Sequence, residues 1–114
     1  SAALEQLIGL GFDRVLTSGQ QPTAEQGIPL LTALHIQSAG RITLLAGCGV
    51  NEGNIRSISE ATDIREFHFS ARVKVPGAML FSNPKVYMGA PGVDENVREI
   101  TSSERVKNTI AQLL

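Results

Sequence analysis

Short β-rich runs alternate with helical patterns along this chain, and that order constrains the fold more than any other feature. The β-rich runs begin near residues 12, 41 and 64. Alternation of this kind favours a parallel sheet with helical crossovers. The spacing of about 23 to 29 residues is close to the roughly 31 that a TIM-type barrel uses for each unit. The sequence therefore predicts an α/β fold, with about three parallel β/α units of an incomplete TIM-type barrel.

Four helices are predicted from apolar spacing and capping residues. The second is expected to begin with the capping pair Thr23 and Gln26, although Pro29 then falls inside it. Asn51 is expected to cap the third, and Thr101 the fourth. The predicted helices cover residues 2–10 (closed by Gly11), 23–39, 54–61 and 101–114, and the apolar positions of the last are Val106, Ile110, Leu113 and Leu114.

The third strand is predicted over residues 64–71, where apolar and polar residues alternate. That alternation places Phe67 and Phe69 on one face, and Glu66, His68 and Ser70 on the other. From residue 72 to 96 the pattern lapses into turn signals. A small hairpin is expected there, with strands at 78–81 and 85–88.

Composition excludes several classes of protein. The 114 residues suit one domain, and no apolar run approaches the roughly 20 residues that a bilayer requires. No basic segment followed by an apolar one is visible, so no signal peptide is predicted. A single cysteine excludes internal disulfides and the common zinc modules. A net charge of −1 with 4% aromatic residues gives no case for nucleic-acid binding.

Polar and small residues follow each predicted strand. Function in parallel β/α units collects where the strands end. We therefore expect Ser18, Gly49 and Ser70 to lie close together on one rim, with His68 beneath them. Gly47 and Gly49 precede a helix, whose free N–H groups favour an anion. The candidate anion-binding residues are thus Ser18, Gly47, Gly49, Ser70 and Arg72. The alternative is a tight turn that needs glycine for its backbone angles.

Two residues of the same region are candidates for chemistry. His68 is the candidate catalytic acid/base and a candidate metal ligand, or else a hydrogen-bonded structural histidine. Cys48 could be a thiolate nucleophile or a soft-metal ligand near a helix start, or else a small apolar residue. Met79 and Met88 could supply thioethers to Cu(I), although core packing is the commoner role of methionine.

Several stretches together resemble the CutC copper homeostasis protein family. The strings RVLTSG and EFHFSAR carry most of the specificity, whereas the glycine turn alone would be weak. Cys48 stands where the family commonly has glycine or alanine, and Ser82 stands where it often has arginine. The matching stretches are residues 11–20, 47–51, 66–72 and 79–83, followed by Val86, Met88 and Gly89.

The resemblance implies a fold and a role. Family members are about twice as long and fold as TIM-type barrels, so residues 1–114 are expected to be a single C-terminal segment of such a barrel. The implied function is cytosolic copper handling and copper tolerance, with Cu(I) held mainly by cysteines of the N-terminal half. Copper is accordingly the expected cofactor of the complete protein more than of this segment. The alternative is a TIM-barrel enzyme that binds a small phosphorylated or carboxylated metabolite at the rim of the last two strands.

An open sheet of three parallel strands predicts association. Its two edges present unpaired N–H and C=O groups, and parallel sheets are rarely left exposed on either face. The barrel-facing side is expected around Leu16, Leu44, and Phe67 or His68. The expected partners are the missing N-terminal half of the barrel or a second copy of this chain, which makes a homo-oligomer the expected form, with neither membrane nor nucleic acid as a partner.

Overall fold

A computed structural model describes residues 1–76 and 97–114 of the chain. The expected hairpin over residues 78–88 lies outside these residues, as do Ser82 and the two methionines. No helix in the described part is long and apolar enough to cross a membrane. The elements are α1 (Ala2–Gly9), β1 (Arg14–Thr17), α2 (Ile28–Ser38), β2 (Thr43–Ala46), α3 (Ile55–Thr62), β3 (Glu66–Phe67), β4 (Arg72–Pro76), β5 (Val97–Thr101) and α4 (Ser103–Ala111).

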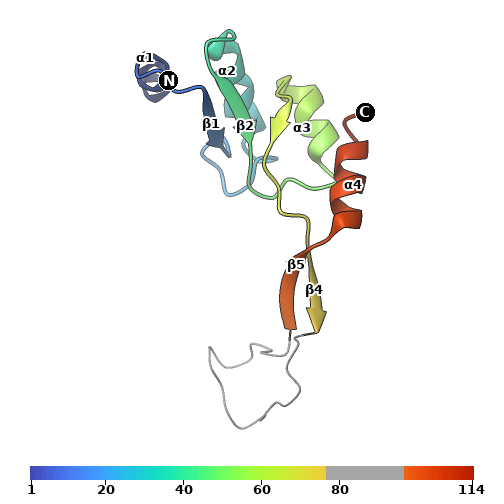
Figure 1. Cartoon of the computed structure of the whole chain (residues 1–114). Coiled ribbons are helices and arrows are strands. Elements are labelled where there is room, and N and C mark those ends of the chain that lie inside the picture. The colour runs from blue at the N-terminus through green and yellow to red at the C-terminus, as the bar shows by residue number, and fades with distance from the viewer. Residues whose placement is uncertain (77–96) are drawn as a thin grey trace, which may run out of the picture.

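The first three strands form a parallel sheet in the order β1-β2-β3, which confirms the predicted fold class (Figure 1). Successive residues of a strand face opposite sides of its sheet. Leu44 and Ala46 of β2 face the helices and are buried, together with Leu31 of α2 and Ile58 of α3. This helix-covered side holds the hydrophobic core.

In the described residues, no helix covers the opposite face of the sheet (Figure 1). Leu16 lies on this face and is 54% exposed, whereas Leu44 is 3% exposed. A Cβ atom at Gly47 would lie 2.6 Å from Leu16 Cδ1 and 3.5 Å from His68 Cβ, so these three residues are neighbours. The predicted barrel-facing side was therefore right for Leu16 and His68. It was wrong for Leu44 and Phe67, which pack with the core.

Two helices begin later than predicted. α2 begins at Ile28, so Pro29 lies in its first turn, where the missing N–H costs no helical hydrogen bond. The Thr23 hydroxyl does accept from Gln26 N, at 3.2 Å, but this contact closes a separate turn before the helix. The N-cap of α4 is Ser102 rather than Thr101, with Arg105 N donating to its hydroxyl at 3.2 Å.

The third strand is much shorter than predicted. β3 ends at Phe67. Ala71, which has a φ of +48°, then separates this segment from β4. Beyond it, β4 pairs with β5 as an antiparallel ribbon that projects from the sheet (Figure 1). These two strands were not predicted, although Val73 and Val75 alternate with charged residues.

Two glycines allow the loop after β1 to fold onto itself. A Cβ atom at Gly27 would lie 1.8 Å from Ser18 O, and one at Gly19 would lie 2.4 Å from Gly27 O. Gly19 also has a φ of +71°, in the region that favours glycine. The loop that leads from β1 into α2 therefore depends on both glycines.

We predict that Gly27→Ala lowers the free energy of unfolding by at least about 2 kcal/mol, because its methyl group would overlap backbone rather than a movable side chain. Gly9→Ala is the matched control. A Cβ atom there meets nothing within 4 Å, and alanine should stabilise α1 by up to about 1 kcal/mol. Urea unfolding monitored by circular dichroism measures both. Equal effects of the two variants would contradict the close approach of Gly27 to the Ser18 carbonyl.

Candidate functional site

The carboxyl ends of the parallel strands bring two loops into contact. Ala24 N, from the loop after β1, donates to Cys48 O at 2.9 Å. A Cβ atom at Gly49 would lie 3.3 Å from Thr23 Cγ2. The ladder continues past the strands, since His68 N donates to Ala46 O at 2.9 Å. The loops after β1 and β2 therefore form one surface at this end of the sheet.

The strand order separates two of the residues expected on one rim. β2 lies between β1 and β3, and two strand spacings amount to about 10 Å. Ser18 and Ser70 consequently lie beyond strands at opposite edges, which corrects the expectation that they lie together. His68 is exposed and lies beside Gly47. Its proposed acid/base role stays a prediction.

The Ser18 hydroxyl and the Gly19 N–H, two donors at the end of β1, already have partners within the protein. Ser18 Oγ donates to Gln21 O at 2.7 Å, and Gly19 N donates to Thr17 Oγ1 at 3.0 Å. An anion at Ser18 would therefore have to displace the contact that shapes its own loop.

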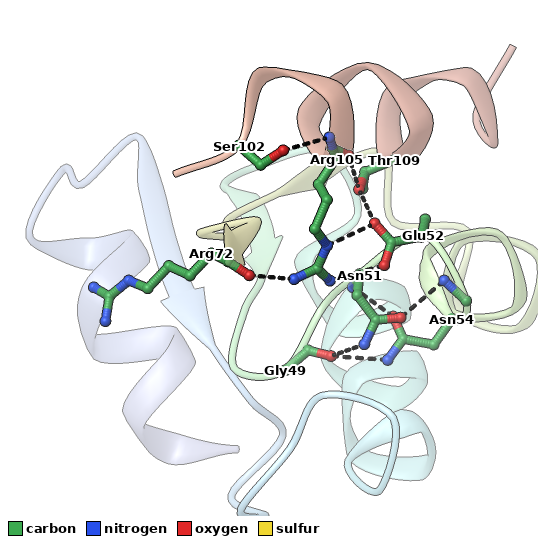
Figure 2. Close-up of polar contacts among 9 residues, drawn as sticks. Gly49, Asn51, Glu52, Asn54, Arg72, Ser102, Arg105 and Thr109 are labelled. Carbon is green, nitrogen blue, oxygen red and sulfur yellow. Dashed lines mark hydrogen bonds and ion pairs between the residues drawn. The ribbon is translucent and has the colours of Figure 1, made fainter. Parts of the chain in front are cut away.

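The turn before α3 is closed by the side chains of two asparagines (Figure 2). Gly53 N donates to Asn51 Oδ1 at 2.8 Å, and Asn51 N donates to Asn54 Oδ1 at 2.9 Å. Both side-chain amides donate back to Gly49 O, at 3.3 Å from Asn51 and 2.8 Å from Asn54. The helix itself begins at Ile55, one turn after the cap expected at Asn51. The glycine turn is thus closed by its own side chains, although Asn54, the N-cap residue of α3, makes no side-chain capping hydrogen bond to the helix.

An ion pair joins the same turn to the C-terminal helix. The Arg105 guanidinium binds both carboxylate oxygens of Glu52, with Nη2 at 2.8 Å from Oε1 and Nε at 3.2 Å from Oε2. Arg105 Nη1 also donates to the Arg72 carbonyl, and Thr109 Oγ1 lies 3.4 Å from Glu52 Oε2. Figure 2 shows Arg105 reaching from α4 between these groups. The protein thus places its own carboxylate near the N-terminal end of α3, where anions are favoured.

The ion pair shifts the titration of both partners. The hydrogen bond from Arg105 lowers the pKa of Glu52, against a smaller opposing effect of desolvation. The same contact raises the pKa of Arg105. The two side chains are 35% and 32% exposed, so solvent screens the pair in part. Sequence reasoning missed this contact because nothing in one sequence links positions 53 residues apart.

Arg72, a predicted anion ligand, belongs to the ribbon instead. Its guanidinium lies 3.6 Å from Glu99 Oε2 on the neighbouring strand β5, and the side chain is 62% exposed. In Figure 2 it extends away from the cluster around Glu52. Only its backbone carbonyl takes part in that cluster.

Cys48 is a free, exposed thiol in an unfavourable backbone conformation. Its φ is +77°, and the next residue, Gly49, has a φ of +70°. A left-handed conformation costs a residue other than glycine about 1–2 kcal/mol. Within residues 1–76 and 97–114, no group of three or more His, Cys, Asp and Glu side chains could hold a metal ion.

A family model and the sequences of known proteins point to the same family. The model of the CutC family matches residues 1–73. A CutC family protein of Bacteroides thetaiotaomicron is 58% identical over 109 residues, which are 95% of this chain and 44% of the relative. One from Bacteroides fragilis is 55% identical over 114 residues, or 99% of this chain and 45% of the relative. The chain thus spans slightly less than half the length of these curated relatives.

A solved structure agrees with the sequence matches. The crystal structure of a protein described as the putative copper homeostasis protein CutC of Streptococcus agalactiae superposes with a TM-score of 0.54 at 30% identity. The superposition covers 59% of this chain and 33% of that protein. The parallel β/α arrangement is therefore shared with part of a TIM-barrel-like fold.

We predict that acid releases α4 before it unfolds the sheet. Because the folded-state pKa of Glu52 lies below its unfolded value, the pair stabilises the fold above a pH of about 4.3 and loses that effect as the pH falls through the folded pKa. Glu52→Gln should accelerate hydrogen exchange of α4 amides severalfold at neutral pH. Glu60→Gln, which removes an exposed pair with Arg56, is the control and should leave α4 unchanged. Equal hydrogen exchange of α4 in both variants would contradict the conclusion that the ion pair between Glu52 and Arg105 holds α4 in place.

We also predict that Cys48→Gly raises the free energy of unfolding by about 1 kcal/mol, because glycine adopts a φ of +77° without steric cost. Cys48→Ala is the matched control, since alanine keeps the left-handed cost and removes the thiol. Denaturant unfolding compares the three proteins. A gain shared by the alanine variant would assign the effect to the thiol rather than to the backbone.

Proposed function

The chain belongs to the CutC family, and on that premise we propose that it acts in copper homeostasis as part of a CutC-type β/α barrel. The observation that carries the proposal is the 58% identity to a CutC family protein over 95% of the chain. The parallel order β1-β2-β3 supports it, since consecutive barrel strands are neighbours. The exposed free thiol of Cys48 supports a reducing compartment such as the cytoplasm.

The donors of this chain do not fit a tight Cu(I) site. Cu(I) prefers several soft ligands, above all thiolates and thioethers. Cys48 is the one cysteine in the sequence, and His68 lies beside Gly47 at the same end of the sheet. The described residues hold no larger group of metal-binding side chains. The proposal therefore assigns the copper ligands of a complete CutC protein to sequence outside these residues.

The enzyme alternative gains no support from the strand ends. Its anion would need free donors, and those of Ser18 and of the turn before α3 bind groups of the protein itself. Glu52 adds a negative charge at the same place, held by Arg105. We therefore propose no reaction for this chain.

Cu(I) titration against a chromophoric chelator tests the proposal. The 114-residue chain and its Cys48→Ser and His68→Ala variants should all fail to compete at submicromolar affinity, because the chain has one thiolate donor and a tight Cu(I) site needs several soft ligands. The full-length CutC protein of Bacteroides thetaiotaomicron, measured beside them, should compete.

Two outcomes would contradict this assignment. Submicromolar binding by the chain that is lost in Cys48→Ser would make Cys48 a ligand. Failure of the full-length relative to bind Cu(I) would remove the copper role itself.

A further inference from the structure

Charged side chains lie on the face of the sheet opposite the helices. Arg14 is on this face because its neighbour Val15 packs with the core, and Glu66 is there because Phe67 does so. Arg14 Nε donates to Glu66 Oε1 at 3.4 Å, and β2 lies between the two strands that carry them. His68 follows two residues after Glu66. An arginine, a glutamate and a histidine therefore share one face.

In a complete CutC-type barrel this face turns inward, since the helices of such a barrel form its outer ring. The interior is normally filled by layers of branched apolar side chains. A charged group placed there is costly unless it is paired and hydrogen-bonded. Packing alone would favour apolar residues at these positions, so the polar set indicates an interior that binds something polar.

The ion pair directs the arginine toward the carboxyl ends of the strands. In the sheet Arg14 lies beside Thr43, whereas Glu66 lies beside Leu45, two residues further along β2. Two residues of a strand rise by about 7 Å. The guanidinium therefore leans by about that distance toward the end at which TIM barrels bind their ligands. Because Glu66 takes Nε, the fork of two terminal nitrogens is the part that suits a carboxylate or a phosphate.

His68 lies still nearer to that end of the sheet. A Cβ atom at Gly47 would lie 2.6 Å from Leu16 Cδ1 and 3.5 Å from His68 Cβ. The glycine thus leaves the space above β2 to the side chains of its two neighbours. The imidazole ring can both donate and accept hydrogen bonds. A small anion held by the guanidinium would consequently have a histidine on the side of the barrel opening.

We propose that Arg14, Glu66 and His68 form part of a binding site inside the complete barrel, for a small molecule that carries a carboxylate or phosphate group. Arg14 binds the oxyanion through its terminal nitrogens, and Glu66 is the positioning residue that holds the guanidinium. His68 hydrogen-bonds a second polar group of the ligand. The site rests on the barrel of the proposed function but not on copper, and it involves binding without an assigned reaction. It also uses none of the loop donors around Ser18.

The test uses a full-length chimera, in which this chain replaces the matching segment of the Bacteroides thetaiotaomicron relative. Inorganic phosphate and acetate are titrated separately, while NMR records the arginine Nε–H and histidine ring signals. We expect one probe or both to shift the Arg14 and His68 signals saturably. The stronger probe shows whether the site prefers a phosphate or a carboxylate.

Matched variants separate the site from general charge effects. Arg14→Lys keeps the charge but removes the fork, and should weaken binding by about tenfold or more. Arg56→Lys is the control and should leave binding unchanged, because Arg56 makes the same Nε–Oε1 contact with Glu60, at 3.1 Å, on the surface of α3. Glu66→Gln should displace the Arg14 Nε–H signal before any probe is added, and should weaken binding.

Three outcomes would overturn the site. They are shifts that do not saturate, equal binding by the Arg14→Lys and Arg56→Lys variants, and a folded chimera that binds neither probe. Copper binding by the same chimera is scored separately, so loss of the site would leave the copper role standing. A chimera that does not fold by circular dichroism would overturn the barrel itself, and with it both proposals.

Discussion

Pairing of β2 with a parallel neighbour on each edge is the interaction on which the other elements depend. The side chains of Leu44 and Ala46 point from β2 into the core, where α2 and α3 pack. The loops after β1 and β2 can meet, through Ala24 and Cys48, because their strands run side by side in the same direction. Within the part of the chain that the structure describes, no helix covers the other face of β2 (Figure 1). The same strand pairing therefore gives both the core on one face and an uncovered surface on the other.

Sequence reasoning succeeded where hydrophobic periodicity decides the structure and failed where a single residue or a distant contact decides it. Alternating strands and helices predicted the parallel sheet and three of its helices closely. Pro29 was the warning that the second helix starts late, since proline is tolerated in a first turn but costly further in. Ala71 gave no such warning, because nothing in its chemistry announces a positive φ. The ribbon β4–β5 was missed because residues 77–96, a stretch rich in turn signals, separate its paired strands.

The candidate site shows a similar division. Strand ends were expected to carry the functional residues, and Gly47, Cys48 and His68 do lie at that end of the sheet. Their roles could not be read from residue type, since a glycine turn before a helix serves an anion or a side-chain cap equally well. Here Asn51 and Asn54 accept from N–H groups of the turn itself, and the Glu52 carboxylate accepts from Arg105. Which acceptor fills a helix start depends on side-chain geometry that one sequence does not specify.

The attachment of α4 has a consequence for the chain's response to salt. Its apolar residues Ile110 and Leu113 remain exposed, Thr109 is buried, and Arg105 adds an ion pair with Glu52. Raising the ionic strength screens a partly exposed ion pair, whereas sulfate or phosphate strengthens apolar burial. Such salts therefore act in opposite directions on two parts of one small chain, loosening the last helix while tightening the sheet and the helices that cover it.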